Sequence, residues 1–294
     1  MYVPFRGHRT WCRRVGEAEA GRHPVLVLHG GPGAAHDYLE PLEDLARTGR
    51  QVIFYDQLGC GRSDHIHDPG LWTVRLFLDE LRTVREQLGL DRVHILGQSW
   101  GGMLAMEHAL ARSKGIESLV ICNSPADMGH WVSEANRLRG ELPREVQLTL
   151  LRHEAAGTTM SLEYQAAMLV FYRRHVCRLD PWPEYIDRSF AQLARDPEVY
   201  NVMCGPSEFY VTGKLRDWTI VHRLGEIREP TLLMSGRYDE ATPEIVGTVH
   251  RGIPGSEWRL FEQSSHMPHA EERKLFMAVL DEFLSRIEQA SRRT

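Results

Sequence analysis

Short runs of apolar residues recur along the chain at intervals that leave room for a helix between them. The continuous runs lie at 25–28, 52–55, 93–96, 119–122 and 231–234, and an alternating run follows at 257–261. Uninterrupted apolar runs of this length are typical of central strands in a parallel sheet, because such strands are buried on both faces. The pattern therefore predicts a mostly parallel central sheet.

Helical periodicity appears between the predicted strands. In the segment 72–88 the apolar residues fall on one stripe at helical spacing, and Gly89 follows as a candidate C-cap. The stretch 271–288 has the same pattern. Alternation of strands and helices predicts an α/β architecture with right-handed crossovers.

The stretch 125–225 departs from this alternation because it contains no convincing strand. We expect helices at 143–155, 161–178 and 183–195, separated by glycines and prolines. The strand pattern then returns at 231. We therefore predict a helical cap at 125–225, inserted into one core formed by residues 1–124 and 226–294; a separate helical domain is the alternative.

Gly97 to Gly102 read G-Q-S-W-G-G and follow the predicted strand 93–96. The pattern G-x-S-x-G also arises by chance, but here a predicted helix comes directly after it, as a nucleophile elbow requires. Gly97 and Gly101 would allow a turn so tight that larger side chains would collide. Ser99 is therefore the candidate nucleophile.

A serine hydroxyl needs a base and an acid to become a strong nucleophile. In this architecture the acid follows a later strand and the histidine follows the last one. Asp239 and His266 occupy those positions. Asp127, after the fourth strand, is an alternative acid, and His269 is an alternative base, although it should fall in a helical turn and face elsewhere.

An oxyanion intermediate needs two hydrogen-bond donors. One should be the backbone N–H of Trp100, the residue after the nucleophile. The other should come from the loop H-G-G-P-G at 29–33, where glycines allow a backbone N–H to approach the substrate. We select Gly31 for this role; a plain Gly-Pro turn is the alternative.

Composition narrows the classes of partner and cofactor. The chain has 294 residues and a formal net charge of −5, which disfavours nucleic acid and anionic membranes as partners. No stretch has the length of a signal peptide or of a membrane span. The five cysteines lack C-x-x-C spacing and the 15 histidines lack H-E-x-x-H. We expect a cytoplasmic protein without a metal site, and the sequence predicts no particular oligomeric state.

Six motifs in order resemble the proline iminopeptidase family of serine α/β-hydrolases, which includes related amino-acid amidases. The resemblance runs from about residue 20 to the C-terminal end. The motifs are H-G-G-P-G at 29–33, D-Q-L-G-C-G-R-S-D at 56–64, G-Q-S-W-G-G at 97–102, G-P-S-E-F at 205–209, R-Y-D-E-A-T-P at 237–243 and S-S-H-M-P-H at 264–269.

The resemblance implies an α/β-hydrolase fold with a cap, a triad of Ser99, Asp239 and His266, and oxyanion donors at Gly31 and Trp100. It also implies that Glu208 and Glu240 bind the free amine of the substrate. The alternative for each glutamate is a solvated charge or an internal ion pair. The aromatic residues Phe171, Tyr172 and Tyr210 are candidates for a substrate pocket, although helix aromatics usually belong to a core. We expect Asp56 and Arg62 to form an internal ion pair.

The function that the family implies is hydrolysis without any cofactor. A serine hydrolase of this kind would release an N-terminal amino acid, proline or a small or apolar residue, from a small peptide or an amino-acid amide through an acyl-enzyme. Three alternatives remain: an amidase without a peptidase role, a general carboxylesterase or lactonase, and a ligand-binding protein without catalysis.

Overall fold

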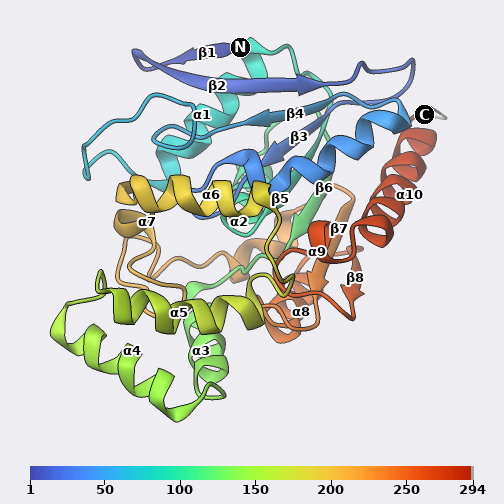
Figure 1. The fold of residues 1–294 in the computed structure, drawn as a ribbon. Coiled ribbons are helices and arrows are strands. Elements are labelled where there is room, and N and C mark those ends of the chain that lie inside the picture. Colours follow the sequence, from blue (N-terminus) through green and yellow to red (C-terminus); the bar gives the residue numbers. More distant parts are fainter. Residues whose placement is uncertain (293–294) are drawn as a thin grey trace.

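One eight-stranded sheet forms the centre of the molecule in the computed structural model, which describes residues 1–292 (Figure 1). The strand order is β1-β2-β4-β3-β5-β6-β7-β8. The strands from β4 to β8 in this order are mutually parallel, whereas β1 and β2 are antiparallel to their neighbours. This is the predicted mostly parallel sheet.

All six predicted strands are present. They are β3 (Val25–Leu28), β4 (Val52–Tyr55), β5 (Val93–Gln98), β6 (Ile116–Cys122), β7 (Thr231–Gly236) and β8 (Glu257–Phe261). The first three are buried at every position, as their apolar sequences require. The N-terminal hairpin of β1 (Tyr2–Phe5) and β2 (His8–Val15) was not predicted from the sequence.

Helices cover the sheet and connect its parallel strands. The predicted helix 72–88 is α1 (Val74–Gln87), which begins where the Thr73 hydroxyl accepts a hydrogen bond from the Leu76 N–H at 3.2 Å. The predicted helix 271–288 corresponds to α10 (Arg273–Ser291), which follows the short α9 (Pro268–Glu271). The core also contains η1 (His36–Thr48), α2 (Trp100–Leu110) and α8 (Pro243–Gly252), and the short η2 (Val221–Glu226) precedes β7.

The segment between β6 and β7 contains five α-helices among the described residues. Within it, α4 and α5 pack on each other, and α6 packs on η1 of the core (Figure 1). The predicted boundaries at 125 and 225 remain our proposal for the limits of the cap. The five are α3 (Met128–Arg139), α4 (Arg144–Ala156), α5 (Leu162–His175), α6 (Glu184–Arg195) and α7 (Glu198–Met203).

A buried ion-pair network attaches the last helix to the sheet. The Arg50 guanidinium lies beside Glu288 of α10 at 2.8 Å, and Arg22 donates a hydrogen bond to the same carboxylate at 2.7 Å. Burial alone would raise the pKa of Glu288, but the nearby His94 imidazole, 3.4 Å away, and hydrogen bonds from Arg50 and Arg22 lower it well below its usual value. Among residues 1–292 no helix is long and apolar enough to cross a membrane.

Candidate active site

Ser99 lies at the junction of β5 and α2, in a backbone conformation with φ of 56° and ψ of −122°. A positive φ is uncommon for a residue other than glycine and often marks a functional site. A Cβ at Gly97 would collide with the carbonyl of Gly101, and a Cβ at Gly101 would collide with the carbonyl of Leu28. Both glycines are therefore required for this turn.

Asp239 and His266 are adjacent and buried, with 1% and 5% of their surfaces exposed. The distance from His266 Nδ1 to Asp239 Oδ1 is 2.6 Å. The same carboxylate accepts hydrogen bonds from the Ala241 N–H at 2.8 Å and from the Asn123 side-chain amide at 2.5 Å. Three donors thus fix the carboxylate, so that it can hold one tautomer of the imidazole.

The alternative acid and base have other roles. Asp127 caps α3 by accepting a hydrogen bond from the His130 N–H at 2.6 Å. His269 lies in α9, and its Nε2 donates to the Tyr38 carbonyl at 3.0 Å. Burial lowers the pKa of His269 to about 4, so this ring is neutral at physiological pH. The geometry favours Asp239 and His266 over both.

Two neighbouring cavities meet at Ser99, and both are also lined by Gly31 and Glu208. The larger cavity, about 540 Å³, contains His266 and Glu240; the smaller one, about 270 Å³, contains Trp100 and apolar side chains such as Trp131. Gly31 and Trp100 thus line the smaller cavity together with Ser99, and their role as oxyanion donors stays a prediction.

The two glutamates predicted to bind an amine both line the larger cavity. Burial raises the pKa of Glu208, while the Tyr200 hydroxyl, which donates to it at 2.6 Å, opposes this rise. Burial, followed by the charges of Glu208 and Asp239, raises the pKa of Glu240 well above its usual value. Glu240 Oε1 is 3.7 Å from His266 Nε2, and Oε2 is buried with no hydrogen-bond partner among the described residues.

Of the three candidate pocket aromatics, only Tyr172 lines the larger cavity. Phe171 is fully buried inside the cap, where its ring centre lies 5.2 Å from that of Phe209. Tyr210 is 37% exposed and lines neither of the two cavities. The prediction was thus wrong for Phe171 and Tyr210. Neighbouring helix positions point about 100° apart, and here Tyr172 faces the cavity while Phe171 packs inside the cap.

Several cavity residues on the cap helices were not predicted from the sequence. Phe190 and Leu193 of α6 line the larger cavity together with Tyr200 of α7. The spacing of three between Phe190 and Leu193 places them on one helix face, which is the only signal that the sequence offered.

The predicted ion pair of Asp56 and Arg62 is wrong. Asp56 accepts a hydrogen bond from the backbone N–H of Arg62 at 2.9 Å, while the Arg62 guanidinium lies 4.7 Å from the centre of the Trp11 ring. The side-chain partner of Asp56 is His36, whose Nδ1 is 2.8 Å away. A buried imidazole thus replaces the expected guanidinium, which stacks on an aromatic ring instead.

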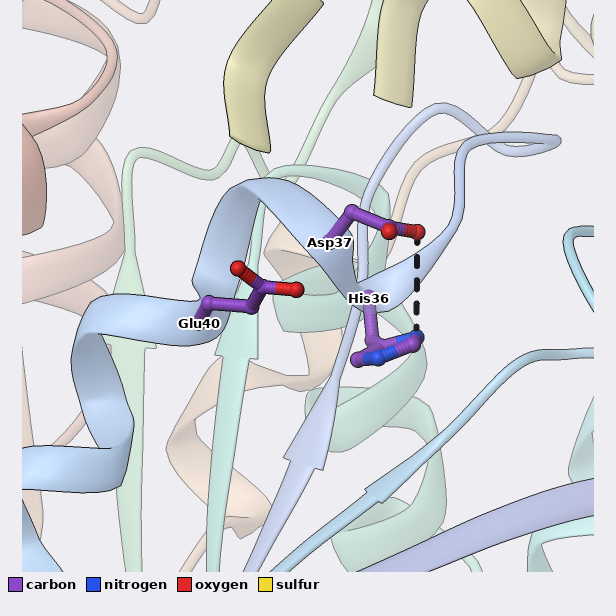
Figure 2. A group of neighbouring side chains, drawn as sticks. All are labelled: His36, Asp37 and Glu40. Carbon is purple, nitrogen blue, oxygen red and sulfur yellow. Dashed lines mark ion pairs between the residues drawn. The ribbon is translucent and has the colours of Figure 1, made fainter. Parts of the chain in front are cut away.

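One cluster in the described chain has the spacing of metal ligands. Figure 2 shows His36, Asp37 and Glu40 on the first turns of η1. One possible ligand atom from each residue lies within 4.8 Å of those of the other two. The Arg188 guanidinium of α6 already binds Asp37 and Glu40, each at 2.5 Å. An ion would have to displace Arg188, so the cluster is better described as an ion-pair network that joins α6 to the core.

Comparisons with known proteins agree with this geometry. Residues 23–273 match the family model described as alpha/beta hydrolase fold. The proline iminopeptidase of Heyndrickxia coagulans is 40% identical over 97% of this chain and 98% of its own length. The crystal structure of a proline iminopeptidase from Mycobacterium smegmatis has a TM-score of 0.92 and 44% identity, with 99% of each chain covered. The crystal structure of VinJ has a TM-score of 0.95 and 46% identity, with 98% of each chain covered. The chain therefore belongs to the proline iminopeptidase family of α/β-hydrolases.

Proposed function

We propose that this chain is a serine aminopeptidase that releases an N-terminal proline, or a similarly small apolar residue, from a small peptide or an amino-acid amide. The observation that carries the proposal is the pair of glutamates in the cavity that contains Ser99 and His266. The substrate ammonium group would satisfy the unpartnered Oε2 of Glu240 and the carboxylate of Glu208 together. A blocked amine or an internal peptide bond would leave both carboxylates without a cation.

The proposed mechanism assigns the steps of a serine triad to these side chains. His266 takes the proton of the Ser99 hydroxyl, and Asp239 stabilises the resulting imidazolium. Ser99 Oγ bonds to the carbonyl carbon, and the N–H groups of Gly31 and Trp100 stabilise the oxyanion. His266 then protonates the leaving amine as the C–N bond breaks. Water hydrolyses the acyl-enzyme by the same steps, and the amino acid is released.

The N-terminal residue should lie in the larger cavity, because both glutamates that would bind its amine line that cavity. In proline the amine nitrogen belongs to the pyrrolidine ring, so the ring and the amine must occupy the same cavity. Phe190 and Leu193, which line this cavity, would offer the ring an apolar surface.

Proline 4-nitroanilide, its N-acetyl form, prolinamide, a dipeptide with N-terminal proline and 4-nitrophenyl acetate together test the proposal. We expect fast hydrolysis of the free-amine anilide, little or none of the acetylated form, and a loss of about 10⁶-fold in kcat in Ser99→Ala. Hydrolysis of prolinamide without any dipeptide hydrolysis would identify an amidase. Equal rates for the free and acetylated anilides would identify a general esterase or lactonase and refute the proposal.

Glu208→Gln separates amine binding from the chemical step. The variant keeps the size of the side chain but removes one negative charge, so kcat/KM for the free-amine anilide should fall roughly tenfold to a hundredfold. Turnover of 4-nitrophenyl acetate, which has no amine, should be preserved. Equal losses on both substrates, or none, would argue against an amine site. Stable binding of proline 4-nitroanilide, with neither turnover nor labelling of Ser99 by a fluorophosphonate, would identify a ligand-binding protein.

We also propose that the enzyme works in the cytoplasm. All five cysteines are unpaired and buried. Free thiols are typical of proteins kept in a reducing compartment.

A further inference from the structure

A chain of buried hydrogen bonds joins the three loops that carry the proposed catalytic groups. The Gly30 N–H donates to the Tyr38 hydroxyl at 2.7 Å, and this hydroxyl donates to Gln98 Oε1 at 2.5 Å. The other end of the Gln98 amide donates from Nε2 to the His266 carbonyl at 3.1 Å. Gly30 and Gln98 directly precede Gly31 and Ser99 in the sequence.

The packing around these groups leaves no room for another arrangement. A Cβ at Gly30 would lie 2.8 Å from Gln98 Oε1, 2.9 Å from the Tyr38 hydroxyl and 3.0 Å from Ser99 Cβ. Tyr38 and Gln98 are 4% and 2% exposed. The Tyr38 backbone is held as well, since its carbonyl accepts the hydrogen bond from His269. Burial raises the pKa of the Tyr38 hydroxyl, so it stays a neutral donor and acceptor.

We propose that Tyr38 and Gln98 are positioning residues that hold the oxyanion loop, the nucleophile and the base in one geometry. The Tyr38 hydroxyl orients the backbone next to Gly31, and the Gln98 amide fixes the loop of His266 relative to Ser99. Both act through backbone groups of the three loops and undergo no proton transfer themselves. This inference rests on the proposed function, because the roles of Gly31, Ser99 and His266 belong to it.

Tyr38→Phe removes one oxygen and leaves the Gly30 N–H and Gln98 Oε1 without their partner. We expect kcat to fall roughly tenfold to a hundredfold with KM for proline 4-nitroanilide changed less than about threefold, because a small displacement of catalytic groups affects the transition state more than binding. Tyr55→Phe is the matched control. The Tyr55 hydroxyl is buried without a hydrogen-bond partner in residues 1–292, so this variant should keep its activity.

Gln98→Glu provides a signature that a packing role would not give. A protonated carboxyl can still donate a hydrogen bond to the His266 carbonyl. An ionised carboxylate has no proton to donate and would lie against the oxygen of that carbonyl. The activity of Gln98→Glu relative to the wild type should therefore fall as pH rises, while Gln98→Leu should show a constant relative loss. The double variant of Tyr38→Phe and Gln98→Leu should lose less than the product of the two single losses, because both break one chain.

The rate of fluorophosphonate labelling of Ser99 measures the same geometry without an amine substrate. Slower labelling of Tyr38→Phe, in a variant that remains folded by its thermal melting curve, supports the inference. The inference would be overturned if Tyr38→Phe kept its kcat and labelling rate, or if the relative loss of activity in Gln98→Glu did not depend on pH. It would also be overturned if the activity losses of the two single variants simply multiplied in the double variant. If the wild type is labelled but does not hydrolyse proline 4-nitroanilide, the proposed function fails while the labelling rates still test the positioning role.

Discussion

Replacing Glu240 by glutamine should stabilise the fold while it weakens the binding of an amine. The wild-type carboxyl is 2% exposed, and its Oε2 has no hydrogen-bond partner among residues 1–292. Burial and the charges of Glu208 and Asp239 raise its pKa in the folded state. Glutamine resembles the protonated form of this group, and it needs no proton to remain neutral.

The sign of the pH effect follows from proton linkage. A group whose pKa is raised on folding holds its proton more tightly in the folded state, so the stability that it contributes is lost as pH rises above its unfolded pKa. Each unit of difference between the two pKa values corresponds to about 1.4 kcal/mol. Glu240→Gln should therefore gain stability relative to the wild type at pH 8, and this gain should shrink toward pH 4 to 5.

Melting temperatures at pH 8 and pH 4.5 test this, since about 1 kcal/mol corresponds to roughly 2 °C in a protein of this size. We expect a rise of several degrees for Glu240→Gln at pH 8 and little change at pH 4.5. In the same variant, kcat/KM for proline 4-nitroanilide at pH 8 should fall at least tenfold. A melting temperature that falls equally at both pH values would refute the reasoning, because it would mean that Glu240 contributes stabilising contacts.

Further predictions concern the acid, a buried ion pair and metals. Asp239→Asn should lower kcat about 10⁴-fold by favouring the wrong imidazole tautomer. Asp127→Asn should change only the free energy of unfolding, by about 1 kcal/mol or less. A larger loss of kcat in Asp127→Asn than in Asp239→Asn would mean that Asp127 is the catalytic acid. Glu288→Gln should destabilise the protein at pH 7, because a carboxyl whose pKa is lowered on folding contributes stability above its unfolded pKa. In melting curves the difference should begin to shrink as pH falls below about 4.5 and should narrow further with each step in acidity. Activity should be unchanged after dialysis against EDTA; a loss that added zinc restores would contradict the serine mechanism.

The central sheet could be predicted because its inner strands are almost entirely apolar. Residues 25–28 and 52–55 contain only apolar side chains and match β3 and β4. The edge hairpin was harder, since β2 reads H-R-T-W-C-R-R-V, in which charged residues interrupt the apolar ones. β2 pairs with both β1 and β4, but only part of it is buried, so its sequence carries a weaker pattern than that of a strand buried at every position.

The candidate triad was accessible from the sequence because each member follows directly on a predicted strand. Parallel strands end at one edge of the sheet, so residues at their ends meet in the structure. The cap residues offered no such rule. The orientation of Phe171 inward and of Tyr172 toward the cavity depends on how α5 packs in the cap, which periodicity alone does not specify.

Three buried carboxylates differ in how many hydrogen bonds the fold provides to them. Glu288 and Asp239 each accept several hydrogen bonds, and each supports a neighbouring group, the last helix in one case and the imidazole in the other. Glu240 differs, because one of its oxygens has no partner in the part of the chain that the structure describes. Leaving a buried polar atom unpaired costs about 1–3 kcal/mol. Under the proposed function, a cation that binds beside Ser99 would recover this cost, which would give the free amine of a substrate an advantage that a neutral ligand cannot have.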